Sequence, residues 1–185
     1  SERTLLTLSN PAYPQVDLKE DIPSEAESAL VRFGRLPLLE GSGREAELIA
    51  QYFKPKDVVS LTGPRATEGN FLSSVKGKNI LHLAAHGFAD DRFGNLFGAV
   101  ALAPPPKNQA ARADDDGFLS LFEIYRLPLQ DCELAVLSAC VTNVGPQQPL
   151  EAGVTLASGF LSAGARRVIA SHWNVNDQAT CDLMN

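Results

Sequence analysis

The 185-residue chain is poor in cysteine, having only Cys132, Cys140 and Cys181 at irregular spacing. An odd and unevenly spaced set indicates neither a disulfide framework nor a zinc site, and it is typical of a protein in a reducing compartment. No apolar run reaches the length of a membrane span, and no charged-then-apolar segment opens the chain as a signal peptide would. We therefore expect a cytoplasmic protein without membrane contact.

Basic stripes and nucleotide motifs are also missing. The formal net charge is −6, which argues against nucleic acid as a direct partner. Neither a Walker pattern nor G-x-G-x-x-G occurs, so no nucleotide cofactor is expected. A G-x-S-x-G elbow is absent as well, which disfavours a small-molecule hydrolase of flavodoxin-like layout, although such an enzyme would share the predicted sheet.

What the chain does contain is short apolar runs that alternate with helical patterns. The runs typical of strands span residues 4–8, 57–62, 79–85, 96–103, 134–140 and 167–170. Helices are predicted over 42–53, 67–75, 120–127 and 150–163, and Leu161 is placed on the apolar face of the last. Ser42 to Glu45 and Ser120 to Glu123 match the capping box. This order predicts a single domain over 1–185, a three-layer α-β-α sandwich around a mostly parallel sheet.

Two predicted strands end in residues that could perform catalysis. Cys140 closes the run from Leu134, and His86 follows the run from Asn79. In an open parallel sheet, chemistry collects outside the carboxyl ends of the strands. If these strands are neighbours, imidazole and thiol face each other, as nucleophilic catalysis by cysteine requires. Most free cysteines are small buried core residues, which is our interpretation of Cys132 and Cys181.

A second histidine, His82, lies four residues before His86 and on the same face by strand alternation. Such a pair could indicate a metal site, but the segment lacks the glutamate and the helical setting of the zinc-protease motif. We therefore expect no metal. Residues 104–117 are interpreted as an exposed loop, with Asp114–Asp116 as a solvated turn.

Four segments, in this order and at these separations, resemble the CHAT domain, a caspase-like and separase-like group of cysteine peptidases. They are Leu83–Gly87, Leu137–Cys140, Phe160–Arg166 and Ser171–Asp177. The resemblance covers about residues 4 to 185. It implies a caspase-haemoglobinase-like fold and a cysteine endopeptidase that acts on a protein or peptide in bacterial signalling or defence. A sensor or helical-repeat region in the same chain or a partner chain is also implied.

By resemblance, Cys140 is the nucleophile and His86 the base. The backbone N–H groups of Gly87 and Cys140 form the oxyanion hole. The family usually has glutamine where this chain has Val141 and glycine where it has Asn143. These departures leave the Cys-His dyad intact and concern the shape of the pocket.

The resemblance also implies a substrate groove after the last predicted strand. Asp177 would line the primary pocket and favour lysine or arginine before the cleaved bond, although its position suits a helix N-cap equally well. Trp173, Asn174 and His172 would form the wall, while a lone tryptophan is more often a core residue. The family usually has leucine where this chain has His172.

A different class of function stays open, which is a catalytically inactive CHAT module that serves as a protein-interaction scaffold. The intact dyad favours the enzyme. The chain starts at Ser1 without methionine, and Asp182–Met184 resemble the interior of a helix. We therefore expect this domain to be cut from a longer protein at both ends.

Overall fold

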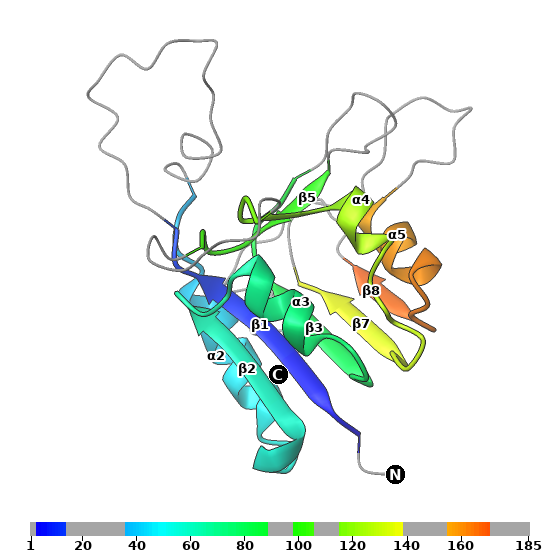
Figure 1. Ribbon diagram of the computed structural model, residues 1–185. Coiled ribbons are helices and arrows are strands. Elements are labelled where there is room, and N and C mark those ends of the chain that lie inside the picture. Colours follow the sequence, from blue (N-terminus) through cyan, green and yellow to red (C-terminus); the bar gives the residue numbers. More distant parts are fainter. Residues whose placement is uncertain (1–2, 14–35, 89–97, 106–114, 139–154, 171–185) are drawn as a thin grey trace, which may run out of the picture.

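Five parallel strands form the central sheet of the computed structural model, which describes residues 3–13, 36–88, 98–105, 115–138 and 155–170 (Figure 1). Their order across the sheet is β2-β1-β3-β7-β8, and every pairing is parallel. The strands are β1 (Leu5–Pro11), β2 (Val58–Gly63), β3 (Ile80–Ala84), β7 (Leu134–Leu137) and β8 (Val168–Ala170). The predicted mostly parallel sheet is confirmed.

Helices cover both faces of this sheet, which gives the predicted three layers. Helix α2 (Glu40–Ala50) lies on one face, while α3 (Glu68–Ser74), α4 (Leu121–Ile124) and α5 (Leu156–Ser162) lie on the other (Figure 1). A 3-10 turn, η1 (Pro55–Asp57), precedes β2. Because successive strand residues alternate between faces, the leucines of β1 and β3 at alternate positions join the core beneath α3, α4 and α5. The face toward α2 carries polar residues as well, including Thr7 and His82.

A second, small antiparallel sheet lies beyond the carboxyl end of β3. It consists of β4 (Gly87–Phe88), β5 (Ala99–Ala101) and β6 (Phe118–Ser120), in that order. The strand predicted over 96–103 is therefore present in part, but it belongs to this separate sheet. The sequence did not predict β4 or β6, because strands of two or three residues are too short to show an alternating pattern.

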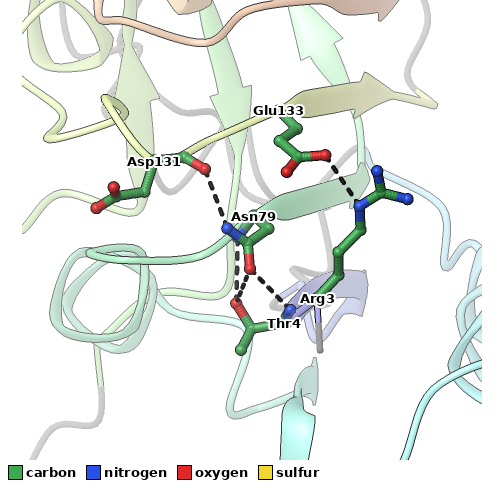
Figure 2. A network of polar contacts seen from close by, with 5 residues as sticks. All are labelled: Arg3, Thr4, Asn79, Asp131 and Glu133. Atoms are coloured by element: carbon green, nitrogen blue, oxygen red, sulfur yellow. Dashed lines mark hydrogen bonds and ion pairs between the residues drawn. The ribbon is translucent and has the colours of Figure 1, made fainter. Parts of the chain in front are cut away.

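A polar network at the amino ends of the strands joins β1, β3 and the turn before β7 (Figure 2). The Asn79 side-chain oxygen accepts from Thr4 N at 3.0 Å, and its Nδ2 donates to the Asp131 carbonyl at 3.2 Å. Arg3 Nε lies 2.9 Å from Glu133 Oε2. These contacts fix how the strands start relative to one another, and therefore which residues lie level at their carboxyl ends.

The capping box predicted at Ser42 to Glu45 is wrong. Helix α2 begins two residues earlier, at Glu40, and Leu39 at its N-cap makes no side-chain cap. Ser42 is buried within the helix, where its hydroxyl donates to the Leu39 carbonyl at 2.8 Å and accepts from Asn10 N at 2.9 Å. Glu45 is buried too and turns toward the sheet, so tertiary contacts replace the local cap.

The other predictions made for the helices and turns had mixed outcomes. The capping box at Ser120 and Glu123 is present at the start of α4. Helix α5 begins after its N-cap Thr155, six residues later than predicted, and Leu161 is 49% exposed rather than on the apolar face. The expected solvated turn at Asp114–Asp116 is wrong in part, because Asp115 Oδ1 is buried. Asp114 lies outside the described residues.

Candidate functional site

The strands that precede the two predicted catalytic residues are direct neighbours. Leu83 of β3 lies level with Leu137 of β7, and Ser138 N donates to the Leu83 carbonyl at 2.8 Å. Two residues beyond the end of β3, His86 lies at the carboxyl edge of the sheet. The neighbourhood of strands that a Cys-His site requires is therefore present. Gly87, the first residue of β4, is described as well. The other predicted site residues lie outside the described part of the chain, namely Cys140, His172, Trp173, Asn174 and Asp177.

The ring of His86 is held by a backbone carbonyl. Its Nε2 lies 2.9 Å from the carbonyl oxygen of Pro37, in the segment just before α2. A carbonyl can only accept, so Nε2 carries the proton in this contact. In the neutral ring, Nδ1 then keeps its lone pair, and this is the nitrogen that can take a proton from a thiol.

Tyr13 fixes His86 from another side. Its hydroxyl accepts from His86 N at 3.4 Å and donates to the Ala101 carbonyl at 3.1 Å. The ring centroids of Tyr13 and His86 are 5.4 Å apart and tilted by 47°. Burial raises the pKa of Tyr13 well above its ordinary value, so the hydroxyl stays a donor at all physiological pH values.

The backbone next to His86 belongs to the small sheet. Ala101 N donates to the His86 carbonyl at 2.8 Å, and Gly87 begins β4, where it lies level with Val100 of β5. The position predicted to supply an oxyanion donor is therefore anchored on a paired strand rather than on an unpaired loop. Its role as a donor stays a prediction.

His82 does not share its surroundings with His86. Strand β3 ends at Ala84, so the alternation that would place both rings on one face does not extend to His86. His82 Nε2 lies 2.7 Å from Glu45 Oε1 on α2, and the Ser138 hydroxyl donates to Glu45 Oε2 at 3.2 Å. This contact could not be predicted from the sequence, because Glu45 matched a capping box.

Other groups in the described part of the chain offer no competing site. Cys132 is fully buried in the core, and this burial raises the pKa of its thiol. Within the described ranges, no three His, Cys, Asp or Glu side chains are arranged to hold a metal ion.

A pocket of about 640 Å³ at the carboxyl end of α2, lined by Ala50, Phe53 and Arg65 among others, contains none of the predicted site residues. In the same ranges, no helix is both long and apolar enough for a bilayer.

Comparison with known proteins agrees with this architecture. No curated protein matches the chain. The family model of the CHAT domain matches residues 1–185 of this chain. CHAT domains are caspase-like, and the parallel sheet with helices on both faces is consistent with that fold. The chain therefore belongs to the CHAT domain family, within the caspase-like clan of cysteine peptidases.

Proposed function

We propose that this CHAT domain is a cysteine endopeptidase in which Cys140 attacks the substrate carbonyl and His86 manages the protons. The observation that carries the proposal is the parallel pairing of β3 with β7, in which Leu83 lies level with Leu137. His86 and Cys140 each follow these paired residues by three positions. The two chain segments therefore leave the same edge of the sheet side by side.

The covalent chain limits how far apart the two residues can be. Cys140 follows Ser138 by two residues, so their Cα atoms are at most about 7 Å apart. Ser138 itself is hydrogen-bonded to Leu83, close to the start of the segment that carries His86. This short tether is compatible with a thiol that reaches the imidazole, which supports the proposal of a dyad.

The proposed reaction uses the tautomer inferred for the neutral His86 ring, in which Nε2 carries the proton. Its Nδ1 takes the proton of the Cys140 thiol as the sulfur bonds to the peptide carbonyl carbon. The N–H groups of Gly87 and Cys140 hold the developing oxyanion. His86 then returns the proton to the leaving amine as the C–N bond breaks. Water next bonds to the acyl carbon and gives one proton to His86. The C–S bond then breaks, His86 returns that proton to the Cys140 sulfur, and the carboxylic product leaves.

The finer parts of the proposal concern the substrate. We propose a protein or peptide lying along the carboxyl edge of the sheet, with Asp177 favouring a basic residue before the cleaved bond. Trp173, Asn174 and His172 are proposed to form the wall of this groove. A regulated role in signalling or defence, in which a sensor or helical-repeat region controls access, follows from the family resemblance.

The test is hydrolysis of a peptide library by the purified 185-residue chain and three variants. Cys140→Ala and His86→Ala should both abolish turnover, because each removes one half of the dyad. Cys132→Ala is the matched control, since it removes a buried thiol elsewhere and should keep turnover. A folded wild type that cleaves nothing would favour the alternative of an inactive interaction module. Wild-type turnover by the Cys140→Ala protein would instead show that Cys140 is not the nucleophile.

A further inference from the structure

The segment that carries Pro37 contacts His86 and must itself be held in place. Pro37 offers the carbonyl that holds His86, but it has no N–H with which to secure its own position. On one side of it, Leu36 packs against the cluster of Tyr13 and Ala101. On the other, the backbone N–H of Leu39 donates to Asn10 Oδ1 at 3.0 Å. One side-chain hydrogen bond from β1 therefore lies two residues from the carbonyl that orients the ring.

Asn10 has an unusual backbone that suits this task. Its φ is +42°, and among the described residues no other non-glycine residue has a positive φ. Asparagine is one of the few side chains that adopts the left-handed region readily. The pairing of β1 with β2 shifts register between Ser9 and Pro11, so the strand bends at Asn10. Backbone strain of this kind, observed beside a candidate site, is a reason to look for a role in that site.

Asn10 also lies at the correct edge of the sheet. The residue before it, Ser9, pairs with Ala84, which is two residues before His86. The Asn10 N–H donates to the Ser42 hydroxyl at 2.9 Å, which ties the same residue to the first turn of α2. Asn10 is therefore fixed through both its backbone and its side chain, and it can hold the Pro37 segment against His86.

We propose that Asn10 is a positioning residue for His86, acting through Leu39 and the Pro37 carbonyl. By holding this carbonyl in place, it keeps the proton on Nε2 and the lone pair on Nδ1, which is the arrangement that a thiol donor needs. The catalytic assignment rests on the proposed function, whereas the orientation of the ring does not. The two parts can therefore be tested separately.

Two substitutions isolate the Asn10 side chain. Asn10→Gly keeps the left-handed backbone, which glycine adopts without strain, and removes the acceptor for Leu39 N–H. Asn10→Asp keeps both an acceptor at the same distance and a tolerance for positive φ. Its negative charge also lies near the amino end of α2, where a helix stabilises anions. The two variants therefore differ in the acceptor for Leu39 N–H and in one negative charge, and Asp serves as the conservative rescue.

The readout that does not depend on turnover is the ring N–H of His86 in ¹⁵N-edited NMR spectra, assigned with His86→Gln. Wild type and Asn10→Asp should both show an Nε2–H signal protected from exchange with water. Asn10→Gly should lose that protection, because the Pro37 carbonyl is no longer held. Protection that persists in Asn10→Gly overturns the proposal, and so does its absence from the wild type.

Peptide hydrolysis supplies the second readout. A displaced base slows the chemical step more than substrate binding, so Asn10→Gly should lower kcat about 10-fold to 100-fold and leave KM nearly unchanged. Asn10→Asp should keep wild-type kcat, and equal losses in both variants overturn the positioning role. If Asn10→Gly does not unfold cooperatively, Asn10→Ser, whose hydroxyl is too short to replace Oδ1, takes its place with the same expected losses. If the wild type cleaves no peptide but the NMR spectra of wild type and variants differ as predicted, the proposed peptidase activity is refuted and the positioning role of Asn10 is supported.

Discussion

Glu45 Oε1 lies 2.7 Å from His82 Nε2 between α2 and the central sheet, and the side chains are 1% and 2% exposed. Burial lowers the pKa of His82 to about 4, so its ring is neutral at pH 7. Neither ring nitrogen has hydrogen-bond geometry toward a described residue. The contact therefore joins a neutral imidazole to a carboxyl group, and it does not act as a pair of full opposite charges.

This burial predicts a loss of stability in mild acid. As the pH falls, the unfolded chain takes up a proton on His82 near pH 6.5, its ordinary value. The folded chain resists that proton down to about pH 4. The unfolded state binds more protons within this window, so the free energy of unfolding falls by up to roughly 3 kcal/mol as the pH drops through it. Urea denaturation at several pH values between 7 and 4 measures the slope.

The matched variant for this slope is His82→Gln, which keeps a polar side chain of similar length and does not titrate. Its free energy of unfolding should change much less with pH over the same window, whatever its absolute stability. An unchanged slope in His82→Gln would show that other groups cause the acid sensitivity. Because only the slope is compared, a general loss of stability in the variant does not affect the conclusion.

A buried glutamate, Glu68, predicts the opposite trend, which is a loss of stability as the pH rises. Glu68 on α3 is 1% exposed. Its burial, followed by the charge and hydrogen bond of Glu123 and the charges of Asp115 and Asp116, raises its pKa to about 9. The folded chain therefore keeps a proton on Glu68 that the unfolded chain releases near pH 4.5. Stability from this group is lost as the pH rises between these two values.

Glu68→Gln should remove that dependence, because an amide imitates the protonated acid and carries no charge. The difference in melting temperature between variant and wild type should grow in favour of the variant from pH 5 to pH 8.5. Thermal unfolding followed by circular dichroism gives both values. Parallel melting curves for the two proteins at every pH would mean that Glu68 titrates normally in the fold.

Two glycines with positive φ allow a prediction about packing. An added Cβ at Gly164 would lie 3.1 Å from the backbone at Leu129 and Gln130, whereas at Gly77 it would meet nothing within 4 Å. Gly77→Ala should cost about 1–2 kcal/mol for its left-handed backbone alone. Gly164→Ala should cost a further 1–3 kcal/mol or so for the close contact. Equal losses in urea denaturation would show that this contact relaxes freely.

The proposed preference for basic residues is tested through Asp177. Asp177→Ala should lower the kcat/KM for lysyl and arginyl peptides more than that for leucyl or methionyl peptides, because a carboxylate in a pocket pairs with a cation. Loss of a helix cap, which is worth about 1 kcal/mol, would depress all substrates together. If the wild type prefers aspartyl or apolar peptides, the pocket assignment is wrong while the dyad is unaffected.

The parallel sheet could be predicted because its strands are apolar runs separated by helical patterns. The placement of His86 and Cys140 after two apolar runs could also be predicted, whereas the adjacency of those runs was only a condition of the site, which the pairing of β3 with β7 supplies. Helix starts were less predictable. The same S-x-x-E pattern caps α4 at Ser120 but lies inside α2 at Ser42, where contacts with Asn10 and His82 replace the cap. No local pattern in the sequence distinguishes these two cases.

The surroundings of His86 could not be predicted for a different reason. Tyr13 and Pro37 are far from His86 in the chain, and they meet it only when β1 and β3 pair. Pro37 contributes a backbone carbonyl, which every residue has, so its identity carries no signal. In the sequence, Asn10 resembles an ordinary turn residue before proline, and the role proposed for it depends on a contact with the backbone of Leu39.

The most direct test of the proposed dyad is labelling by a peptidyl electrophile that reacts with thiolates, followed by mass spectrometry of the 185-residue chain. A thiol activated by His86 should react at Cys140 and leave Cys132 and Cys181 unmodified, and His86→Ala should slow that reaction by at least about 100-fold. Labelling of Cys132 or Cys181 in place of Cys140, or equal rates at Cys140 with and without His86, would contradict the assignment of the Cys-His dyad.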